Sequence, residues 1–250
     1  MTRLFRIEHN GAPAYAIESD GAYRLVDGDI YGGPPYRTGA TIKPARILAP
    51  VLPSKILGIG LNYKDHAAER NKPLPPEPLM FMKPGTAVIG PDDPIRLPSN
   101  VGRVDYESEL GVVIGKRAYR VAAERALDYV LGFTCVNDVT ARDLQSRDVQ
   151  YTRAKGFDSF APIGPCIAIG LNSAALDIEG WLNGDKRQSS NTRQLIFSVS
   201  DVIAWASAVM TLLPGDVIAT GTPAGIGPLA PGDRFTVKIE GIGELTNPVT

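Results

Sequence analysis

Acidic side chains recur at every second position in the segment from Arg103 to Gly115. If this segment is a strand, its side-chain period of two places Asp105, Glu107 and Glu109 on one face. Carboxylates spaced in this way lie about 7 Å apart at Cα, so their side chains can converge on one point. Like charges in a row destabilise a strand unless solvent or a cation neutralises them. The segment is therefore a candidate site for a hard divalent cation such as Mg²⁺ or Mn²⁺, with an exposed acidic strand face as the alternative.

The residues that follow favour the metal site. Residues 110–114 are mainly apolar, which indicates that the strand enters a core, where unpaired charges are costly. A further oxygen ligand is available in Asp138, which ends the apolar segment 135–138 at a point where a side chain can reach into a cleft. The alternative role for Asp138 is to cap the helix expected after it.

Scarce residue types exclude several other chemistries. The chain has only two histidines, His9 and His66, so a site with three histidine ligands is impossible. No nucleophile elbow of the form G-x-S-x-G, no Walker A loop and no G-x-G-x-x-G motif opening a helix occurs. Catalysis would have to rest on carboxylates, lysines and His66.

Composition indicates an ordinary globular protein. The 250 residues are 44% hydrophobic and 21% charged, and 26 basic residues against 27 acidic ones give a net charge of −1. This balance lacks the excess of positive charge that is typical of proteins that bind nucleic acid or an anionic membrane. No apolar run of membrane-spanning length occurs, and the first residues lack the apolar run of a signal peptide. The two cysteines, Cys135 and Cys166, form neither a metal pair nor a disulfide framework. We expect a soluble cytoplasmic protein with reduced thiols.

The first fifty residues predict a small β module. Strands are expected at residues 4–7, 14–17 and 23–26, with a turn at Asn10-Gly11 between the first two. Glycine and proline at residues 32–35, and the region up to Pro53, indicate a loop or linker. The sequence thus predicts an N-terminal module at 1–50 and a catalytic domain at 51–250.

The second region begins with elements that could cover a site. Residues 56–60 predict a buried strand and residues 62–70 a short helix, whereas the proline-rich segment 71–78 can be neither helix nor sheet interior. A short helix followed by such a tether is typical of a movable lid. An ordinary surface loop is the alternative.

The remaining elements alternate without strict βαβ order. Helices are expected at 122–130, after Asp138 or Thr140, and at 201–213 with Ser200 or Asp201 as the cap. Strands are expected at 131–136, 217–220, 234–239 and 244–249. This pattern predicts an α+β fold, mostly β, with a predominantly antiparallel or mixed sheet.

Several stretches together resemble the fumarylacetoacetate hydrolase family. The resemblance runs in order from about residue 52 to the end of the chain. The matching stretches are residues 58–69, Phe81-Met82-Lys83-Pro84, residues 105–110, residues 137–145, Lys155-Gly156-Phe157-Asp158, residues 162–165 and Gly221-Thr222-Pro223. Each stretch is weak alone, and their combination is highly specific.

This resemblance implies a fold and a site. The fold would be a mixed β-sandwich roll, usually a homodimer, and the small N-terminal module resembles that of bacterial members. Mg²⁺ or Mn²⁺ would be held by Glu107, Glu109 and Asp138. His66 and Glu69, which share a helix face at a spacing of three, would form a dyad when the lid closes, with Lys155 as the active-site lysine. The positions implied to contact substrate are Gln145, Thr222, Arg142 and Asp158.

The implied reaction passes through a metal-stabilised enolate of a small 2-oxo acid. Hydrolysis of a C–C bond in an acylpyruvate is the first expectation. The alternatives are isomerisation of 2-hydroxyhepta-2,4-diene-1,7-dioate and decarboxylation of oxaloacetate or 5-oxopent-3-ene-1,2,5-tricarboxylate, in keeping with the breakdown of aromatic compounds. A more distant alternative is a non-enzymatic binding module in which the cation only stabilises a β-sandwich.

Overall fold

The computed structural model describes residues 1–19 and 21–250, and over these residues the chain is built mainly from strands. The largest sheet is mixed, because β16 pairs in parallel with β6, and β8 with β13, among otherwise antiparallel neighbours. Its strands are, in spatial order, β4 (Arg37–Ile42), β3 (Ala22–Asp27), β2 (Ala12–Ser19), β1 (Thr2–His9), β13 (Ala161–Ile169), β11 (Val130–Asn137), β10 (Ser108–Ile114), β16 (Val217–Ala219), β6 (Lys55–Gly60) and β7 (Leu79–Pro84), with β5 (Arg46–Leu48) beside β1 and β8 (Val88–Ile89) beside β13.

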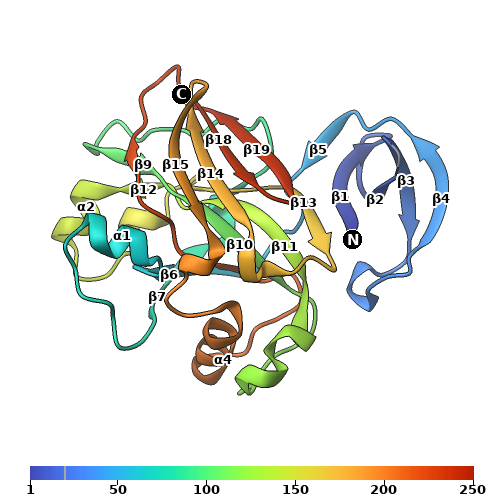
Figure 1. Ribbon diagram of the computed structural model, residues 1–250. Helices are drawn as coiled ribbons and strands as arrows, with labels where there is room; N and C mark the ends of the chain where they lie inside the picture. The colour runs from blue at the N-terminus through green and yellow to red at the C-terminus, as the bar shows by residue number, and fades with distance from the viewer. Residues whose placement is uncertain (20) are drawn as a thin grey trace.

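The N-terminal strands form one end of this sheet. Strands β1 to β5 are drawn in blue on the right of Figure 1, and they join the remainder where Leu4 of β1 pairs with Ile167 of β13. The three expected strands and the turn at Asn10-Gly11 are present. The expectation of a loop or linker up to Pro53 is wrong in part, because β4 and β5 lie in that region.

The middle of the sheet is apolar on both faces. Val112 and Ile114 of β10 belong to one hydrophobic cluster, whereas Val113 between them belongs to a second cluster. Alternate side chains of a strand point to opposite faces, so a continuous apolar run is what a strand covered on both sides requires. These strands form a rigid frame for the polar residues at their ends.

Two smaller sheets complete the β structure. The three-stranded sheet consists of β12 (Thr140–Ala141), β9 (Val104–Tyr106) and β17 (Gly227–Pro228), and the four-stranded sheet of β15 (Asp185–Asn191), β14 (Asp177–Leu182), β18 (Arg234–Ile239) and β19 (Gly243–Pro248). The four-stranded sheet lies over β10 and β11 in Figure 1, and Tyr106 of β9 stacks on Phe235 of β18 at 4.2 Å. The expected α+β, mostly β, mixed sandwich is confirmed.

Helices are few and short. The α-helices are α1 (Lys64–Glu69), α2 (Arg142–Arg147), α3 (Thr152–Lys155) and α4 (Val199–Val209), and the 3₁₀ helices are η1 (Ile30–Gly32), η2 (Gly85–Ala87), η3 (Ala123–Tyr129), η4 (Ser173–Ala175) and η5 (Thr192–Gln194). Within the described residues, no helix combines the length and the apolar character needed to cross a membrane.

Three helix predictions need correction. The helix expected at 122–130 is the 3₁₀ helix η3, and α4 begins at Val199 because the Ser198 hydroxyl caps it in a capping box with Asp201. Helix α2 follows Ala141, which provides no side-chain cap, so neither Asp138 nor Thr140 caps it. The alternative role for Asp138 is therefore excluded.

Helix α1 ends in a tight chain reversal. Asn71 has a φ of 50°, its N–H donates to the carbonyl of Ala68 at 3.1 Å, and the N–H of Lys72 donates to that of Ala67 at 3.0 Å. These bonds define a Schellman motif, in which the left-handed residue turns the chain back across the end of the helix. The proline-rich residues that follow form neither helix nor strand as far as Pro78.

Candidate active site

The acidic segment is not one continuous strand. Strand β9 ends at Tyr106 and β10 begins at Ser108, in a different sheet, so Glu107 lies at the break between them. The side-chain oxygen of Asn137 accepts the N–H of Glu107 at 2.9 Å, which holds the backbone at this point. The prediction that Asp105 shares the face of Glu107 and Glu109 is therefore wrong, because strand periodicity does not carry across the break.

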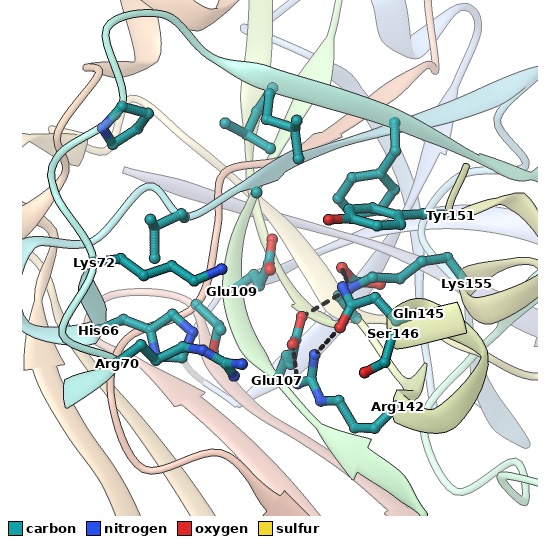
Figure 2. A pocket seen from close by; sticks show the side chains of 18 residues that line it. His66, Arg70, Lys72, Glu107, Glu109, Arg142, Gln145, Ser146, Tyr151 and Lys155 are labelled. Atoms are coloured by element: carbon teal, nitrogen blue, oxygen red, sulfur yellow. Dashed lines mark hydrogen bonds and ion pairs between the residues drawn. The ribbon is translucent and has the colours of Figure 1, made fainter. Parts of the chain in front are cut away.

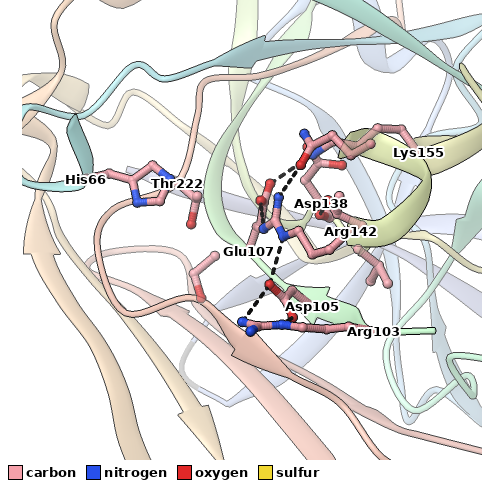
Figure 3. Close-up of polar contacts among 12 residues, drawn as sticks. His66, Arg103, Asp105, Glu107, Asp138, Arg142, Lys155 and Thr222 are labelled. Carbon is pink, nitrogen blue, oxygen red and sulfur yellow. Dashed lines mark hydrogen bonds and ion pairs between the residues drawn. The ribbon is translucent and has the colours of Figure 1, made fainter. Parts of the chain in front are cut away.

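Asp105 has a different role from the two glutamates. Its carboxylate accepts hydrogen bonds from Arg103 Nε at 2.6 Å and from Arg142 Nε at 2.7 Å. Figure 3 shows this network continuing through Arg142 to Glu107. Asp105 is thus an internal counter-ion of the arginines, not a member of the carboxylate cluster.

Three other carboxylates do converge. Glu107, Glu109 and Asp138 are buried, and one oxygen of each lies within 4.8 Å of the others. The register explains this arrangement: Ser108 pairs with Asn137 at the end of the β10–β11 ladder, so Glu107 and Asp138 are the next residues on the two strands. The N–H of Asp138 donates to the carbonyl of Glu107 at 2.9 Å, which fixes the pair.

Buried cations hold two of the three carboxylates. Lys155 Nζ, at the end of α3, donates to Asp138 Oδ2 at 2.6 Å and to Glu107 Oε2 at 3.0 Å. Lys83 of β7 donates to the other oxygen of Asp138, and Arg142 of α2 to the other oxygen of Glu107. Glu109 has no cationic partner within the described residues; its Oε2 accepts only the N–H of Gly221, at 2.8 Å.

The charges differ accordingly among the carboxylates. Burial by itself would raise the pKa of Glu107, but Arg142 and Lys155 outweigh this effect and hold the pKa well below its usual range. Burial, together with the neighbouring Asp138 and Glu107, raises the pKa of Glu109 well above its usual range. An additional positive charge beside Glu109 would relieve this repulsion. Three buried carboxylates with one undercompensated member fit a hard divalent cation.

The cluster opens into a pocket of about 400 Å³. Figure 2 shows side chains from α1 and the segment after it along one side, those of α2 and α3 along the other, and the glutamates between them. Most of the predicted site residues line this pocket, namely His66, Glu107, Glu109, Asp138, Arg142, Gln145, Lys155 and Thr222. The fold therefore gathers residues that are up to 156 positions apart in the sequence, from His66 to Thr222.

The predicted partner of His66 is also in place. His66 is 7% exposed, and its Nδ1 lies 3.0 Å from Glu69 Oε2, one turn further along α1. The other oxygen of Glu69 accepts the N–H of Gly225 at 3.0 Å. Glu69 thus orients the imidazole ring and connects α1 to the loop that follows Thr222. Among the described residues no hydrogen bond to Nε2 occurs, and His66 lines the pocket.

Thr222 is positioned by its neighbours. Gly221 has a φ of 102°, and a Cβ at this position would lie 2.8 Å from the Cβ of Asn62, so only glycine fits. The Thr222 hydroxyl accepts a hydrogen bond from Gln188 Nε2 at 2.9 Å, and Gln188 Oε1 accepts the N–H of Ser108. Gln188 therefore links the Thr222 loop to the strand that carries Glu109.

One predicted residue lies elsewhere. Asp158 is exposed and lines a separate shallow hollow with Arg96 and Leu97, away from the carboxylates. Conversely, the sequence did not single out Lys83, which is fully buried against Asp138, although it lies within a stretch that matches the family. Arg70, Lys72 and Tyr151 also line the pocket. Arg70 and Lys72 are exposed cations that follow a helix, and such residues carry no distinctive sequence signal. Only the fold shows that they line the pocket.

The comparisons with known proteins agree with this geometry. The family model described as fumarylacetoacetate (FAA) hydrolase C-terminal matches residues 55–250. The structure of 2-hydroxyhepta-2,4-diene-1,7-dioate isomerase from Mycobacterium marinum superposes with a TM-score of 0.92 at 42% identity, covering 100% of this chain and 98% of that one. The mitochondrial oxaloacetate tautomerase of Xenopus laevis is 43% identical over 216 residues, 81% of this chain and 68% of that protein.

A third relative was solved with ligands. Fumarylpyruvate hydrolase from Pseudomonas aeruginosa, in complex with Mn²⁺ and pyruvate, superposes with a TM-score of 0.76 at 34% identity, covering 82% of this chain and 92% of that one. The chain belongs to the fumarylacetoacetate hydrolase family and is an enzyme, as the sequence predicted. The alternative of a non-enzymatic binding module is set aside.

Proposed function

We propose that this enzyme hydrolyses a C–C bond of an acylpyruvate-like 2,4-dioxo acid with Mg²⁺ or Mn²⁺. The observation that carries the proposal is that a buried carboxylate cluster and an oriented His66–Glu69 pair face the same pocket. The cluster supplies a place for a cation, and the pair supplies a base. The Mn²⁺ and pyruvate complex of the Pseudomonas enzyme supports a cation and a 2-oxo acid at this site.

The residues present suit the metal. Glu107, Glu109 and Asp138 would hold it through carboxylate oxygens, since each carboxylate has several lone pairs and can also accept the bonds described above. A bound divalent cation would supply a Lewis acid that stabilises negative charge on the oxygens of the 2-oxo acid. Lys155 keeps Glu107 and Asp138 in place, and an ammonium has three N–H donors, of which these two bonds use two.

His66 would act as the general base. It takes a proton from a water molecule whose oxygen forms a bond to the C4 carbonyl carbon of the substrate. The C3–C4 bond then breaks, its electron pair becomes the enolate of pyruvate, and a carboxylic acid leaves. Lys155 helps to offset the enolate charge, and the imidazolium of His66 returns its proton to C3, which completes pyruvate and restores the neutral base. Glu69 stabilises the imidazolium that forms in the first step.

A second candidate is proton transfer alone. Two relatives at 42% and 43% identity are named as an isomerase and an oxaloacetate tautomerase. The same site would interconvert enol and keto forms of a 2-oxo acid if no water were placed beside His66. Decarboxylation of oxaloacetate would use the same enolate.

Steady-state assays would separate these candidates. We expect loss of acetylpyruvate absorbance with release of pyruvate, abolished by EDTA and restored by Mg²⁺ or Mn²⁺. Turnover of the enol of oxaloacetate without cleavage of acetylpyruvate would instead establish the tautomerase. Purified protein that transforms neither compound with either metal would refute the proposed chemistry.

The His66 variant tests the base directly. His66→Gln should lower kcat for hydrolysis by about 10²–10⁴ if His66 is a general base. His9→Gln is the matched control, because His9 is the only other histidine and lies on β1 outside the pocket. An unchanged kcat in His66→Gln would remove this residue from the mechanism.

A further inference from the structure

Two cations in the pocket have no partner in the protein. Arg70 and Lys72 line the pocket that contains the carboxylates. In the part of the chain that the structure describes, neither side chain makes a hydrogen bond or an ion pair. Arg142 and Lys155, the other cations of the pocket, are both engaged by buried carboxylates. Arg70 and Lys72 are therefore the cations of the pocket whose charge no carboxylate of the described residues offsets.

The fold directs both side chains to the same place. Arg70 follows His66 by four positions, so it continues the helix face that carries the histidine. The Schellman motif at Asn71 then turns the chain so that Lys72 returns to this side. Figure 2 shows the three side chains reaching from one side toward Glu107 and Glu109.

Part of the opposite side of the pocket is apolar. Phe81 and Tyr151 lie edge to face at 5.8 Å, and Leu79 also lines the pocket. These side chains suit a carbon chain, whereas the cations on that side, Arg142 and Lys155, are already engaged by buried carboxylates. A negatively charged group away from the carboxylate cluster would thus be drawn to the side of Arg70 and Lys72.

We propose that Arg70 and Lys72 form a subsite for a second carboxylate, so that the preferred substrate is a dicarboxylic 2-oxo acid. This inference rests on the proposed function for the position of the 2-oxo acid end, at the carboxylate cluster. Arg70 and Lys72 are specificity-determining residues that bind the distal carboxylate. The neutral tail of acetylpyruvate leaves the subsite unused, whereas fumarylpyruvate carries a carboxylate at the end of its tail.

A binding experiment tests the subsite independently of turnover. Calorimetry on the Mg²⁺-loaded protein would compare 2-oxoglutarate with 2-oxopentanoate, which has the same five-carbon chain without the distal carboxylate. Neither has a C–C bond between two ketones to hydrolyse. We expect 2-oxoglutarate to bind about tenfold more tightly, as for one or two charge-assisted contacts at a solvent-accessible site.

The variants assign the preference to the two residues. Arg70→Gln and Lys72→Gln should each lose about threefold or more of the affinity for 2-oxoglutarate, and the double variant should bind the two acids equally. Affinity for 2-oxopentanoate should not change. Lys64→Gln is the charge-matched control, because Lys64 is exposed on the same helix but does not line the pocket.

The outcomes distinguish this inference from the proposed function. Equal affinities of the wild-type protein for the two acids, or an equal loss for both acids in the variants, would overturn the subsite. Failure to cleave both acetylpyruvate and fumarylpyruvate would instead refute the hydrolase while leaving the calorimetric comparison intact. With fumarylpyruvate as the substrate, the double variant should raise KM about tenfold, whereas Lys64→Gln should leave KM unchanged.

Discussion

Arg142 lies at the edge of the carboxylate cluster, where it bonds to the protein itself. The family resemblance implies contact with substrate, whereas the structure shows its guanidinium bonded to Asp105, Glu107 and Gln145. The side chain is 14% exposed, so most of its hydrogen-bonding capacity is directed into the protein. Its removal would leave two buried carboxylates short of a partner.

Arg142→Met should therefore destabilise the fold. Loss of one partner from a buried ion pair costs about 3–5 kcal/mol, and Arg103 and Lys155 would retain part of the pairing, so we expect a loss of about 3 kcal/mol. Urea unfolding of the metal-free protein measures this change. Unaltered stability with a raised KM would assign Arg142 to substrate binding alone.

For Glu109 we expect the opposite result, a loss of metal affinity without a loss of stability. Glu109→Gln should lower the affinity for Mn²⁺ about a hundredfold or more, because one charged ligand is lost. The stability of the metal-free protein should not fall and should rise at pH values above the usual pKa range of Glu109, because glutamine still accepts the N–H of Gly221 and carries no charge for Asp138 and Glu107 to repel. Calorimetry and thermal unfolding measure the two effects. The exposed Glu244→Gln serves as control, and a Glu109 variant with full Mn²⁺ affinity would exclude this residue as a ligand.

Spacing and residue type together predict part of this site. The period of two singles out Glu107 and Glu109, and the apolar run after them makes unpaired charges costly. Asp105 was assigned wrongly, because the break at Glu107 depends on the side chain of Asn137, thirty positions away. Lys83 was missed because its importance comes from contact with Asp138, which only the tertiary structure creates.

Element ends are determined by capping contacts that span only a few residues. Ser198 and Asp201 start α4 earlier than its hydrophobic pattern indicates, and Asn71 ends α1 by adopting a positive φ. The types of most elements could be predicted from hydrophobic periodicity. The strands β4 and β5 could not, because glycine, proline and threonine give that region a loop-like composition, and pairing with β3 and β1 forms the strands.

The Asn71 turn allows a test at the level of one element. Asn71→Ala should cost about 1 kcal/mol, because a residue with a Cβ and no compensating side-chain hydrogen bond is disfavoured at positive φ. Asn71→Gly should cost little. Limited proteolysis within residues 71–78 should be faster in the alanine variant and near the wild-type rate in the glycine variant. Equal rates in all three proteins would show that the turn does not hold this segment over the pocket.

The predicted division at residue 50 bears on the whole molecule. The family model starts at residue 55, yet β1 contributes Leu4 and Ile7, both fully buried, to the hydrophobic clusters and pairs with β13. Figure 1 shows this module at one end of the molecule, remote from α1 and α2 beside the pocket. Its contribution should be to stability and not to the chemistry of the site.

Removal of residues 1–50 should accordingly expose an unpaired strand edge. The backbone of residues 167–169 in β13 would lose its partner strand, and the apolar side chains that face Leu4 would be uncovered. We expect a lower Tm and concentration-dependent association, since free apolar edges template pairing between molecules. Differential scanning calorimetry and light scattering measure these effects.

The milder variant Leu4→Ala, which keeps the pairing, should lower the free energy of unfolding by about 2–5 kcal/mol and leave Mn²⁺ affinity unchanged. A truncated protein with the Tm of the full chain would show that the first fifty residues form an independent domain.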